Sequence, residues 1–276
     1  MNVDMHIHTC YTDGSQTPEE VVACAKERDV GIISVCDHNS IEAYERLCEA
    51  CYAHSVELIQ GVELDCRWRG YSLHILAYNF DPLDRPLMDA IDKTRAELDH
   101  VSVHLLKQMT RDHPVIDLDE YAVYKKPPGR GGWLALNYLT DKGVARDLYD
   151  AMKFYDTYDP YTPDYYDIGA LCRMITGAGG VPVLAHPVNW WDESTEGLFD
   201  VLTELKNSGV QGIECYYPRH SPAFTGMLAG FCRRNGMRVT CGGDGHGTFA
   251  QFVGGVERGI GVVKTDVSLL DLDGML

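Results

Sequence analysis

Apolar positions along the chain fall into short runs typical of buried strands and longer amphipathic stretches typical of helices. In the first eighty residues the two kinds of segment mostly alternate. Strands are predicted at residues 3–8, 31–36, 56–64 and 71–78, and helices at 18–28 and 40–53. Thr17-Pro18-Glu19-Glu20 fits a helix start, with threonine as N-cap and proline at the first helical position. This alternation predicts parallel strands joined by helical crossovers.

The pattern changes between residues 81 and 163. A long helical stretch covers 87–112, a Gly- and Pro-rich loop covers 125–132, and tyrosines and aspartates gather at 155–166. We therefore expect a helical insertion domain at 81–163 within a catalytic domain formed by 1–80 and 164–276. The tyrosine-rich segment fits a lid over a site, a dimer contact or ordinary packing of the insertion.

The strand and helix rhythm resumes at residue 168. Helices are predicted at 168–177, at 198–208 and up to 235, and strands at 181–185, 212–216 and 238–241. About seven strand–helix units closing into a barrel is the simplest α/β architecture for this pattern. An open doubly wound sheet is the alternative.

Residues of metal-ligand type stand at the predicted strand ends. His6 and His8 are two apart on the first strand, so both rings project from one face. Later strands carry Asp37-His38, Glu63, His74, His186 and Asp244-Gly245-His246. Barrel enzymes keep their sites at the carboxyl ends of strands, so these residues would converge on one rim. They are too many for one ion, which predicts two or three metals with a bridging carboxylate.

Five short motifs carry a resemblance to a known family. They are Asp4-Met5-His6-Ile7-His8-Thr9 with Thr12-Asp13-Gly14, Cys36-Asp37-His38-Asn39, Gly61-Val62-Glu63, Ala185-His186-Pro187 and Gly243-Asp244-Gly245-His246. Together they resemble the motifs of the polymerase and histidinol phosphatase (PHP) family of phosphoesterases. The resemblance spans both ends of the chain. It implies a distorted seven-stranded (β/α) barrel with a trinuclear metal site.

Carried over position by position, the resemblance implies three ion sites. The first would use His6, His8, Glu63 and Asp244, the second Glu63, His74 and His186, and the third Asp13, His38 and His246. Nitrogen and oxygen ligands without thiolate suit Mn²⁺, Zn²⁺ or Fe²⁺. Asp37 and Asp4 are predicted to orient the histidines. The expected reaction is hydrolysis of a phosphate ester by a hydroxide bridging two metals.

Two loops bear on the substrate. Arg130 stands in the Gly-rich loop of the insertion, where arginine matches phosphate geometry and glycine allows close backbone approach. Arg219 and His220 follow a predicted strand; Arg219 would clamp a phosphate, and His220 would bind one or act as general acid. With Asp37, His220 forms the expected catalytic pair. Lys125 and Lys126 are expected to be solvated.

The insertion with its Gly-Arg loop resembles one branch of the family. Members of that branch act on nucleotide 3′,5′-bisphosphates, on short RNA 5′ ends or on cyclic phosphate sugars. The branch often has Gly-Arg-Pro-His at this loop, whereas this chain has Gly131-Gly132 in place of Pro-His. We expect a small substrate with two phosphate groups, one at the metals and one held by arginine. A phosphorylated sugar, including a cyclic phosphodiester, fits as well as a nucleotide.

Two other activities remain open from the sequence. A histidinol-phosphate phosphatase of the same family would need a site for a cationic amine, which the arginines oppose. A metal-dependent amidohydrolase cleaving C–N bonds can also begin with His-x-His, but usually bridges its metals with a carboxylated lysine. Glu63 stands at the matching place here.

Composition and charge limit the kinds of molecule that the chain is expected to bind. The net charge of −17 opposes non-specific binding of duplex nucleic acid. There is no secretory leader pattern and no run of 18 apolar residues, so we expect a cytoplasmic protein with no membrane span. The ten cysteines are scattered, which favours reduced thiols, and Cys48 and Cys51 fit helix packing. No sequence pattern predicts an oligomeric state.

Overall fold

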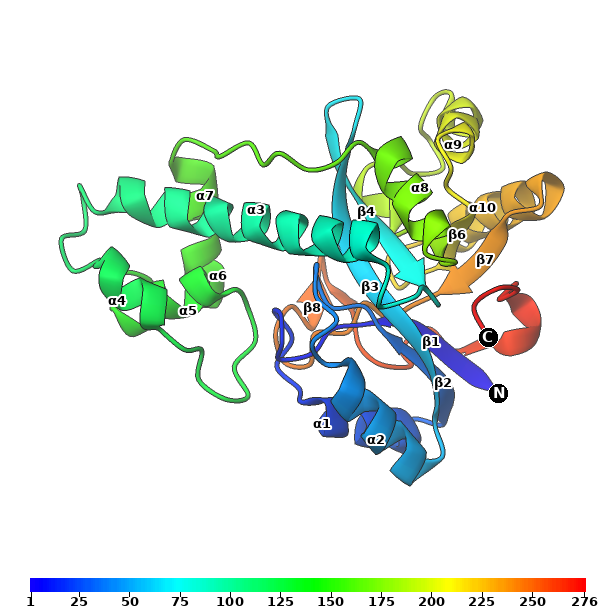
Figure 1. Cartoon of the computed structure of the whole chain (residues 1–276), viewed down its shortest axis with the longest axis horizontal. Helices are drawn as coiled ribbons and strands as arrows, with labels where there is room; N and C mark the ends of the chain where they lie inside the picture. Colours follow the sequence, from blue (N-terminus) through cyan, green and yellow to red (C-terminus); the bar gives the residue numbers. More distant parts are fainter.

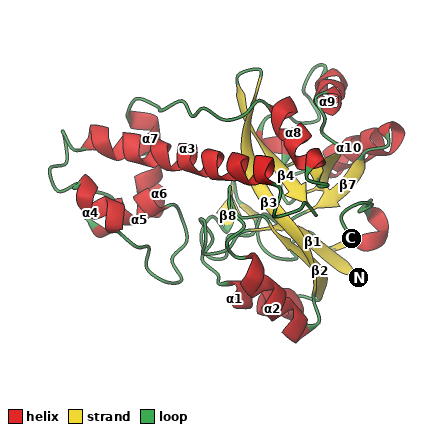
Figure 2. Ribbon diagram, in the orientation of Figure 1, coloured by secondary structure: helices red, strands yellow, loops and turns green.

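The computed structural model describes all residues, 1–276, as a mixed α/β fold around one nearly closed, barrel-shaped sheet (Figures 1 and 2). The main strands are β1 (Asn2–Ile7), β2 (Val30–Val35), β3 (Glu57–Trp68), β4 (Tyr71–Tyr78), β5 (Val181–Leu184), β6 (Gly212–Tyr216), β7 (Arg238–Cys241) and β10 (Thr265–Asp266). Their order in the sheet is β10-β1-β2-β3-β4-β5-β6-β7. The backbone of His8 bonds to Gly245, beyond β7, and so draws the two edges together. The barrel prediction is confirmed.

Strand direction differs from the prediction at one place. β3 and β4 form an antiparallel hairpin, and β4 is also antiparallel to β5, whereas the other neighbours among β1–β7 are parallel. Trp68 pairs with Tyr71 across a two-residue turn in which Arg69 and Gly70 both have positive φ, at 48° and 83°. That conformation matches the twist of a hairpin and needs no helical crossover. Glu63 consequently lies within a long strand and not at its end.

The chain has ten α-helices. They are α1 (Pro18–Glu27), α2 (Tyr44–His54), α3 (Arg85–Met109), α4 (Leu118–Val123), α5 (Leu134–Asp141), α6 (Leu148–Met152), α7 (Phe154–Thr157), α8 (Ile168–Gly177), α9 (Leu198–Asn207) and α10 (Pro222–Asn235). Thr17 caps α1 through a reciprocal pair of hydrogen bonds with Glu20. α1 and α2 lie near β1 and β2, while α8 to α10 lie near β5 to β7 (Figure 1). No helix combines the length and apolar character needed to cross a membrane.

The helix α3 brings the 81–163 segment to the site. β4 is antiparallel to both neighbouring strands, so its last residue, Tyr78, lies beside Val181, the first residue of β5. The chain therefore leaves β4 at the end of the barrel opposite the carboxyl ends of the parallel strands. α3 then travels back for 25 residues, about 37 Å at the usual helical rise. α4 to α7 gather around its far half (Figure 1). They share an apolar cluster that also takes in Phe249 from the C-terminal region.

The C-terminal thirty residues form elements that the sequence pattern did not predict. β8 (Phe252–Val253) and β9 (Val256–Glu257) make a small hairpin, with Gly254 and Gly255 both at positive φ in the turn. β10 then pairs antiparallel with β1. Strands of two residues carry too little periodicity to be recognised from hydrophobic pattern.

The chain is closely packed where β7 ends beside β1. A Cβ atom at Gly242 would lie 2.2 Å from the His6 Cβ and 2.4 Å from a carboxylate oxygen of Glu214. His6 and Glu214 are both fully buried, so neither side chain can move into solvent to make room.

Replacing Gly242 by alanine is therefore expected to lower the free energy of unfolding by about 2 kcal/mol through overpacking. Gly226 lies inside α10 with no atom within 4 Å of an added Cβ, so Gly226→Ala should raise stability by about 0.5–1 kcal/mol. Urea denaturation of both variants checks the pair. Equal effects of the two substitutions would contradict the packing account.

Candidate metal centre

A cavity of about 610 Å³ opens where the barrel, α3, α6 and the β8–β9 hairpin meet. Its floor is made of histidines and carboxylates from the barrel, and its walls are largely apolar. Of the predicted ligands, those lining the cavity are Asp13, His38, Glu63, His74, His186, Asp244 and His246. His6 and His8 lie directly beneath them, both fully buried.

The structure brings all nine predicted ligand residues together. Their donor atoms form four overlapping groups within which all atoms lie within 4.8 Å of one another. The groups are His8, Asp13, His38 and His246; His6, His8 and Asp244; His6, Glu63 and His186; and His38, Glu63 and His74. The groups contain the same nine residues as the three ion sites that the motif resemblance implies but divide them differently, since His74 and His186 fall in separate groups.

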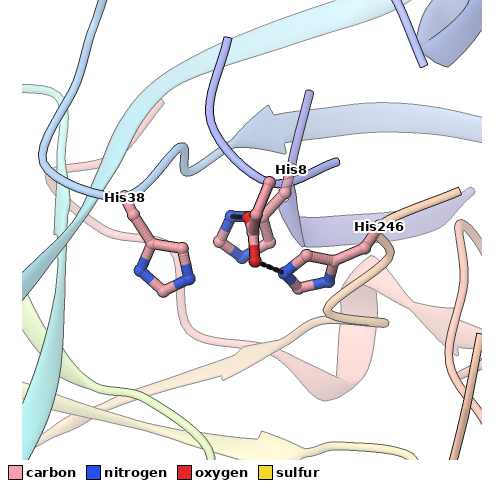
Figure 3. A group of neighbouring side chains, drawn as sticks. His8, His38 and His246 are labelled. Atoms are coloured by element: carbon pink, nitrogen blue, oxygen red, sulfur yellow. Dashed lines mark ion pairs between the residues drawn. The ribbon is translucent and has the colours of Figure 1, made fainter. Parts of the chain in front are cut away.

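The first group lies at the end of β1. The rings of His8, His38 and His246 face the same small volume (Figure 3). The centroids of His8 and His246 are 4.0 Å apart, and the Nε2 of His246 lies 3.2 Å from a carboxylate oxygen of Asp13. Burial lowers the pKa of His38 to about 4, although the nearby carboxylates of Glu63 and Asp13 oppose that shift.

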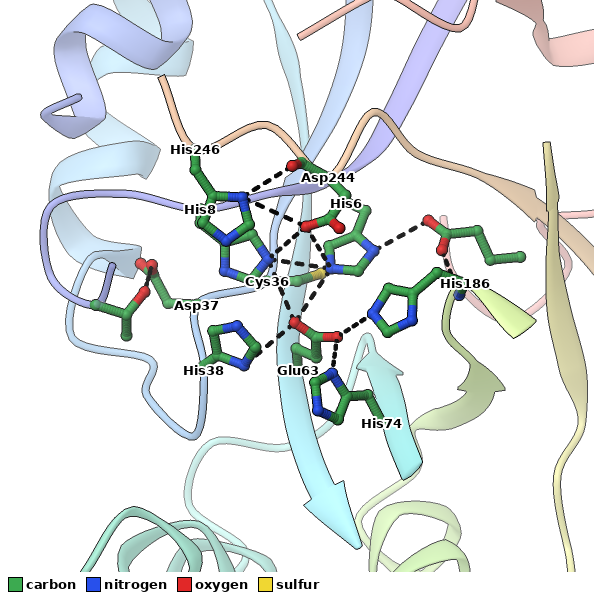
Figure 4. Close-up of polar contacts among 12 residues, drawn as sticks. His6, His8, Cys36, Asp37, His38, Glu63, His74, His186, Asp244 and His246 are labelled. Carbon is green, nitrogen blue, oxygen red and sulfur yellow. Dashed lines mark hydrogen bonds and ion pairs between the residues drawn. The ribbon is translucent and has the colours of Figure 1, made fainter. Parts of the chain in front are cut away.

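Glu63 occupies the middle of the cluster and is 1% exposed (Figure 4). Its Oε2 lies 3.3 Å from a ring nitrogen of each of three histidines, His6, His8 and His38. Its Oε1 lies 2.7 Å from His74 Nδ1 and 2.8 Å from His186 Nε2. Burial alone would raise the pKa of Glu63, but the surrounding imidazoles, led by His38 and His74, hold it well below its usual value. The carboxylate therefore stays ionised.

The cluster favours positive charge at its centre. Burial would lower the pKa of His8, yet its bonds with Asp244 and Glu63 raise that pKa to about 9. Burial would raise the pKa of Asp13, but the nearby rings of His246 and His38 outweigh that effect and hold the pKa below its usual value. Such a set of carboxylates can be satisfied by protons or by divalent cations.

Glu214, which sequence reasoning missed, fixes two of the histidines. It is fully buried on β6, and its Oε1 lies 3.0 Å from His6 Nδ1. Its Oε2 accepts a 2.7 Å hydrogen bond from the backbone N–H of His186, whose φ of 24° is unusual for a residue with a side chain. A partner on Nδ1 leaves the opposite nitrogen of His6 facing the cluster. No motif marks Glu214, because only the closed barrel places it beside β1.

Asp37 and Asp4 do not touch the histidine rings, contrary to expectation. The Asp37 carboxylate accepts hydrogen bonds from the backbone and hydroxyl of Thr9 and from the hydroxyl of Thr12. Asp4 accepts from the backbone N–H groups of His6, Gly243 and Gly261. Both hold the loops that carry ligand-type residues. Asp37 and Asp4 therefore affect the site by fixing the backbone of these loops and not by contacting the rings.

The arginine that reaches the cavity is Arg258, directly after β9, and not one of the predicted arginines. Its Nη1 lies 2.7 Å from Asp244 and its Nη2 lies 2.8 Å from His246 Nδ1. Tyr217 donates a 2.9 Å hydrogen bond to the same aspartate. No motif around Arg258 predicts a role at the site, because it is a single arginine in a stretch rich in glycine and valine.

The predicted substrate residues lie outside this cavity. Arg130 pairs with Asp141 at 2.7 Å, and its loop approaches Phe249 and the backbone of Asp13 instead of an anion. Arg219 donates a 2.7 Å hydrogen bond to the side-chain oxygen of Asn189. Asn189 lines the cavity, whereas Arg219 does not. His220 does not line the cavity; its Nδ1 lies 2.9 Å from the Cys215 carbonyl, and burial lowers its pKa to about 4.

Lys126 and the tyrosine-rich segment also differ from expectation. Lys126 is half-buried and donates to the carbonyls of Thr12, Gly14 and Gly132, the closest at 2.7 Å. It thereby ties the insertion to the loop that carries Asp13. Within the 155–166 segment, Tyr155 bonds to Ser102 on α3 and no residue lines the cavity. Packing, not a lid, describes this segment.

The cluster has the properties of a cation site. His8 Nδ1, Asp13 Oδ1 and Glu63 Oε2 are buried without a hydrogen-bond partner. Buried polar atoms are rarely left unpaired, so three within one cluster indicate a missing partner. Imidazole and carboxylate donors without thiolate suit first-row divalent metals. The residues present therefore fit divalent metal ions.

Known proteins resemble this chain over most of its length. A 3′,5′-nucleoside bisphosphate phosphatase of Chromobacterium violaceum is 24% identical over 260 residues, covering 89% of this chain and 87% of that protein. The 5′-3′ exoribonuclease Rnm of Escherichia coli is 26% identical over 253 residues, covering 88% and 84%. A phosphoribosyl 1,2-cyclic phosphate 1,2-diphosphodiesterase of Eggerthella lenta is 24% identical over 260 residues, covering 90% and 95%.

Solved structures share the fold. One from Bifidobacterium adolescentis, assigned as a metal-dependent phosphoesterase, superposes with a TM-score of 0.80 at 23% identity, covering 97% of this chain and 93% of that one. One from Chromobacterium violaceum, described as an amidohydrolase with bound sulfate, gives 0.69 at 22% identity, covering 94% and 92%. Residues 4–126 match the PHP domain family. The N-terminal part of the chain thus matches a PHP domain, and the whole chain is similar in fold to a metal-dependent phosphoesterase.

Proposed function

We propose that the chain hydrolyses a small phosphorylated compound, using divalent metals held by nine side chains at the cavity floor. The observation that carries the proposal is the overlap of four donor groups, two of which share Glu63. One carboxylate shared between groups is the arrangement that bridges neighbouring ions. Two or three ions fit this set, with Mn²⁺, Zn²⁺ and Fe²⁺ as the candidates.

Following the motif resemblance, the residues divide into three proposed ion positions, of which the first two share Glu63. His6, His8, Glu63 and Asp244 would hold one; Glu63, His74 and His186 a second; Asp13, His38 and His246 a third. When bound, such ions supply a water of lowered pKa and neutralise phosphoryl oxygens.

The chain's own residues orient this floor and limit water. Glu214 presents His6 toward the cluster, and Asp65, 3.2 Å from His74 Nε2, does the same for His74. Arg258 keeps a permanent positive charge at the edge of the floor, where it can face a phosphoryl oxygen. Trp133 packs against His38 at 5.1 Å between centroids and covers one side of the cluster.

Amidohydrolase activity is the second candidate, favoured by the fold shared with a structure of that description. Glu63 opposes it, since a carboxylated lysine usually bridges metals in that group. A histidinol-phosphate phosphatase needs an acid free to bind an amine. Asp65, the acid nearest the wall, already contacts His74 and Asn39.

Metal removal is the first test. Chelation should abolish phosphate release from small phosphate esters, and added Mn²⁺ or Zn²⁺ should restore it. Because His8 must lose a proton to act as ligand and its pKa is raised to about 9, metal affinity should increase as pH rises toward that value. Proton release on titration with metal, followed by calorimetry at two pH values, measures this. Full turnover by metal-free protein would refute the proposal.

Glu63→Gln should remove the shared ligand charge. We expect phosphate release to fall at least about a hundredfold and the bound metal per chain to drop. The matched control is Glu57→Gln, an exposed position on the same strand, which should leave both unchanged. Metal content by elemental analysis accompanies the kinetics. Equal metal content and rate in Glu63→Gln would contradict a bridging role.

Glu214→Gln tests how His6 is oriented. Both carboxylate oxygens of Glu214 are used as acceptors, whereas glutamine offers one acceptor and one donor. If the amide N–H faces His6 Nδ1, the proton moves to Nε2 and blocks that ligand, so metal affinity should fall about 10–100-fold. Nitrogen NMR of His6 in metal-free protein should report the changed tautomer.

Asp37→Asn is the matched control for Glu214→Gln. Asp37 is equally buried but bonds to threonines and the backbone, not to a ring. It should lower stability without changing the His6 tautomer. An unchanged tautomer and metal affinity in Glu214→Gln would leave Glu214 with only a packing role.

A further inference from the structure

The cavity walls above the metal floor are built from apolar side chains. These are Leu98 from α3, Trp133, Tyr149 and Met152 from the helical segment, and Phe249, Ala250, Phe252 and Val253 from the C-terminal region. Tyr149, Met152 and Phe252 are also 53%, 47% and 59% exposed. Exposed apolar side chains gathered at the mouth of a polar site indicate a surface that a ligand covers.

The same walls carry no positive charge available for a second phosphate. Arg258 is the only lysine or arginine that lines the cavity, and its guanidinium already contacts Asp244 and His246 at the floor. Arg130 is neutralised by Asp141, and Arg219 bonds to Asn189. A charged group placed against the apolar walls would lose hydration without gaining a partner, which is costly.

The flat side chains among the wall residues favour a planar ligand group. Tyr149 and Phe249 stack at 6.0 Å with their rings 21° from parallel, and Trp133 lies across the floor beside His38. Aromatic faces gain most from contact with another ring or flat apolar surface. The floor therefore takes the phosphate, and the walls take an uncharged, planar group.

We infer, resting on the proposed function, that the substrate is a phosphate ester with one phosphate and an uncharged, planar apolar alcohol, and that Phe252 determines this specificity. In the reaction the P–O bond to the alcohol breaks and a water oxygen bonds to phosphorus. One water proton goes to the leaving oxygen, giving the alcohol and inorganic phosphate. This differs from the two-phosphate substrate that the sequence predicts.

Phe252 is suited to this role by its position. It begins a hairpin whose turn, Gly254-Gly255, holds positive φ at both residues. Its side chain borders the cavity yet is mostly exposed, so a bound planar group would remove its apolar surface from water. Arg258, at the other end of the hairpin, faces the floor. One small element thus contacts both parts of the ligand.

The test compares esters whose alcohols differ in shape but not in reactivity. Metal-loaded protein is assayed with phenethyl phosphate and butyl phosphate, and affinity for phenethylphosphonate and butylphosphonate is measured by calorimetry. We expect kcat/KM and affinity to be at least about tenfold higher for the phenethyl compounds. Phe252→Ser should lose about tenfold with the phenethyl pair and clearly less with the butyl pair.

Two controls isolate the inference. Tyr52→Ser changes an aromatic side chain on α2 that is 91% exposed and far from the cavity lining, and it should change neither quantity. Adenosine 3′-phosphate and adenosine 3′,5′-bisphosphate test the second phosphate, and the monophosphate should be hydrolysed at least as efficiently.

The outcomes separate the two proposals. Hydrolysis of phenethyl and butyl phosphate at equal efficiency, or a tenfold preference for the bisphosphate, overturns the single-phosphate inference and leaves the phosphoesterase proposal standing. No phosphate release from any of the four esters, with metals shown to be bound, overturns both. Equal losses with both alcohols in Phe252→Ser remove Phe252 from the specificity role.

Discussion

The buried carboxylate of Glu63 is the constraint on which the rest of the structure depends. It lies among five histidines, each within 3.3 Å of one of its oxygens, and is 1% exposed. A carboxylate so placed is stable only with compensating positive charge and with neighbours held in fixed orientations. The requirement extends outward to Glu214, Asp65 and Asn39, which hold the histidines or one another.

The barrel is irregular where this constraint acts. The β3–β4 hairpin replaces a strand–helix unit, and it places Glu63 and His74 on facing strands so that they meet at 2.7 Å. Gly242 leaves room for His6 and Glu214 to approach across the closing edge of the barrel. A regular alternation of strands and helices would have put Glu63 and His74 at separate strand ends, as the sequence pattern suggested.

The proposed metal floor and the cavity walls come from different parts of the chain. Every residue of the proposed metal floor belongs to the barrel strands or the loops at their ends, whereas the wall comes mainly from the 81–163 segment and the C-terminal hairpin. Lys126 joins the two parts by donating to the backbone around Asp13. The relatives named for bisphosphate phosphatase, exoribonuclease and cyclic phosphate diphosphodiesterase activities differ from this chain at about three aligned positions in four.

The sequence by itself favoured a barrel over an open doubly wound sheet and identified most strands and the nine ligand-type residues, because hydrophobic periodicity and ligand spacing are local properties. Tertiary structure alone decided strand direction at β4, the role of Glu214 and the partners of Arg130, Arg219 and His220. A side chain's partner depends on which distant segment the fold brings beside it, and neither local pattern nor residue type carries that information. Arg258 lies next to Asp244 only because the chain returns to the barrel after β9.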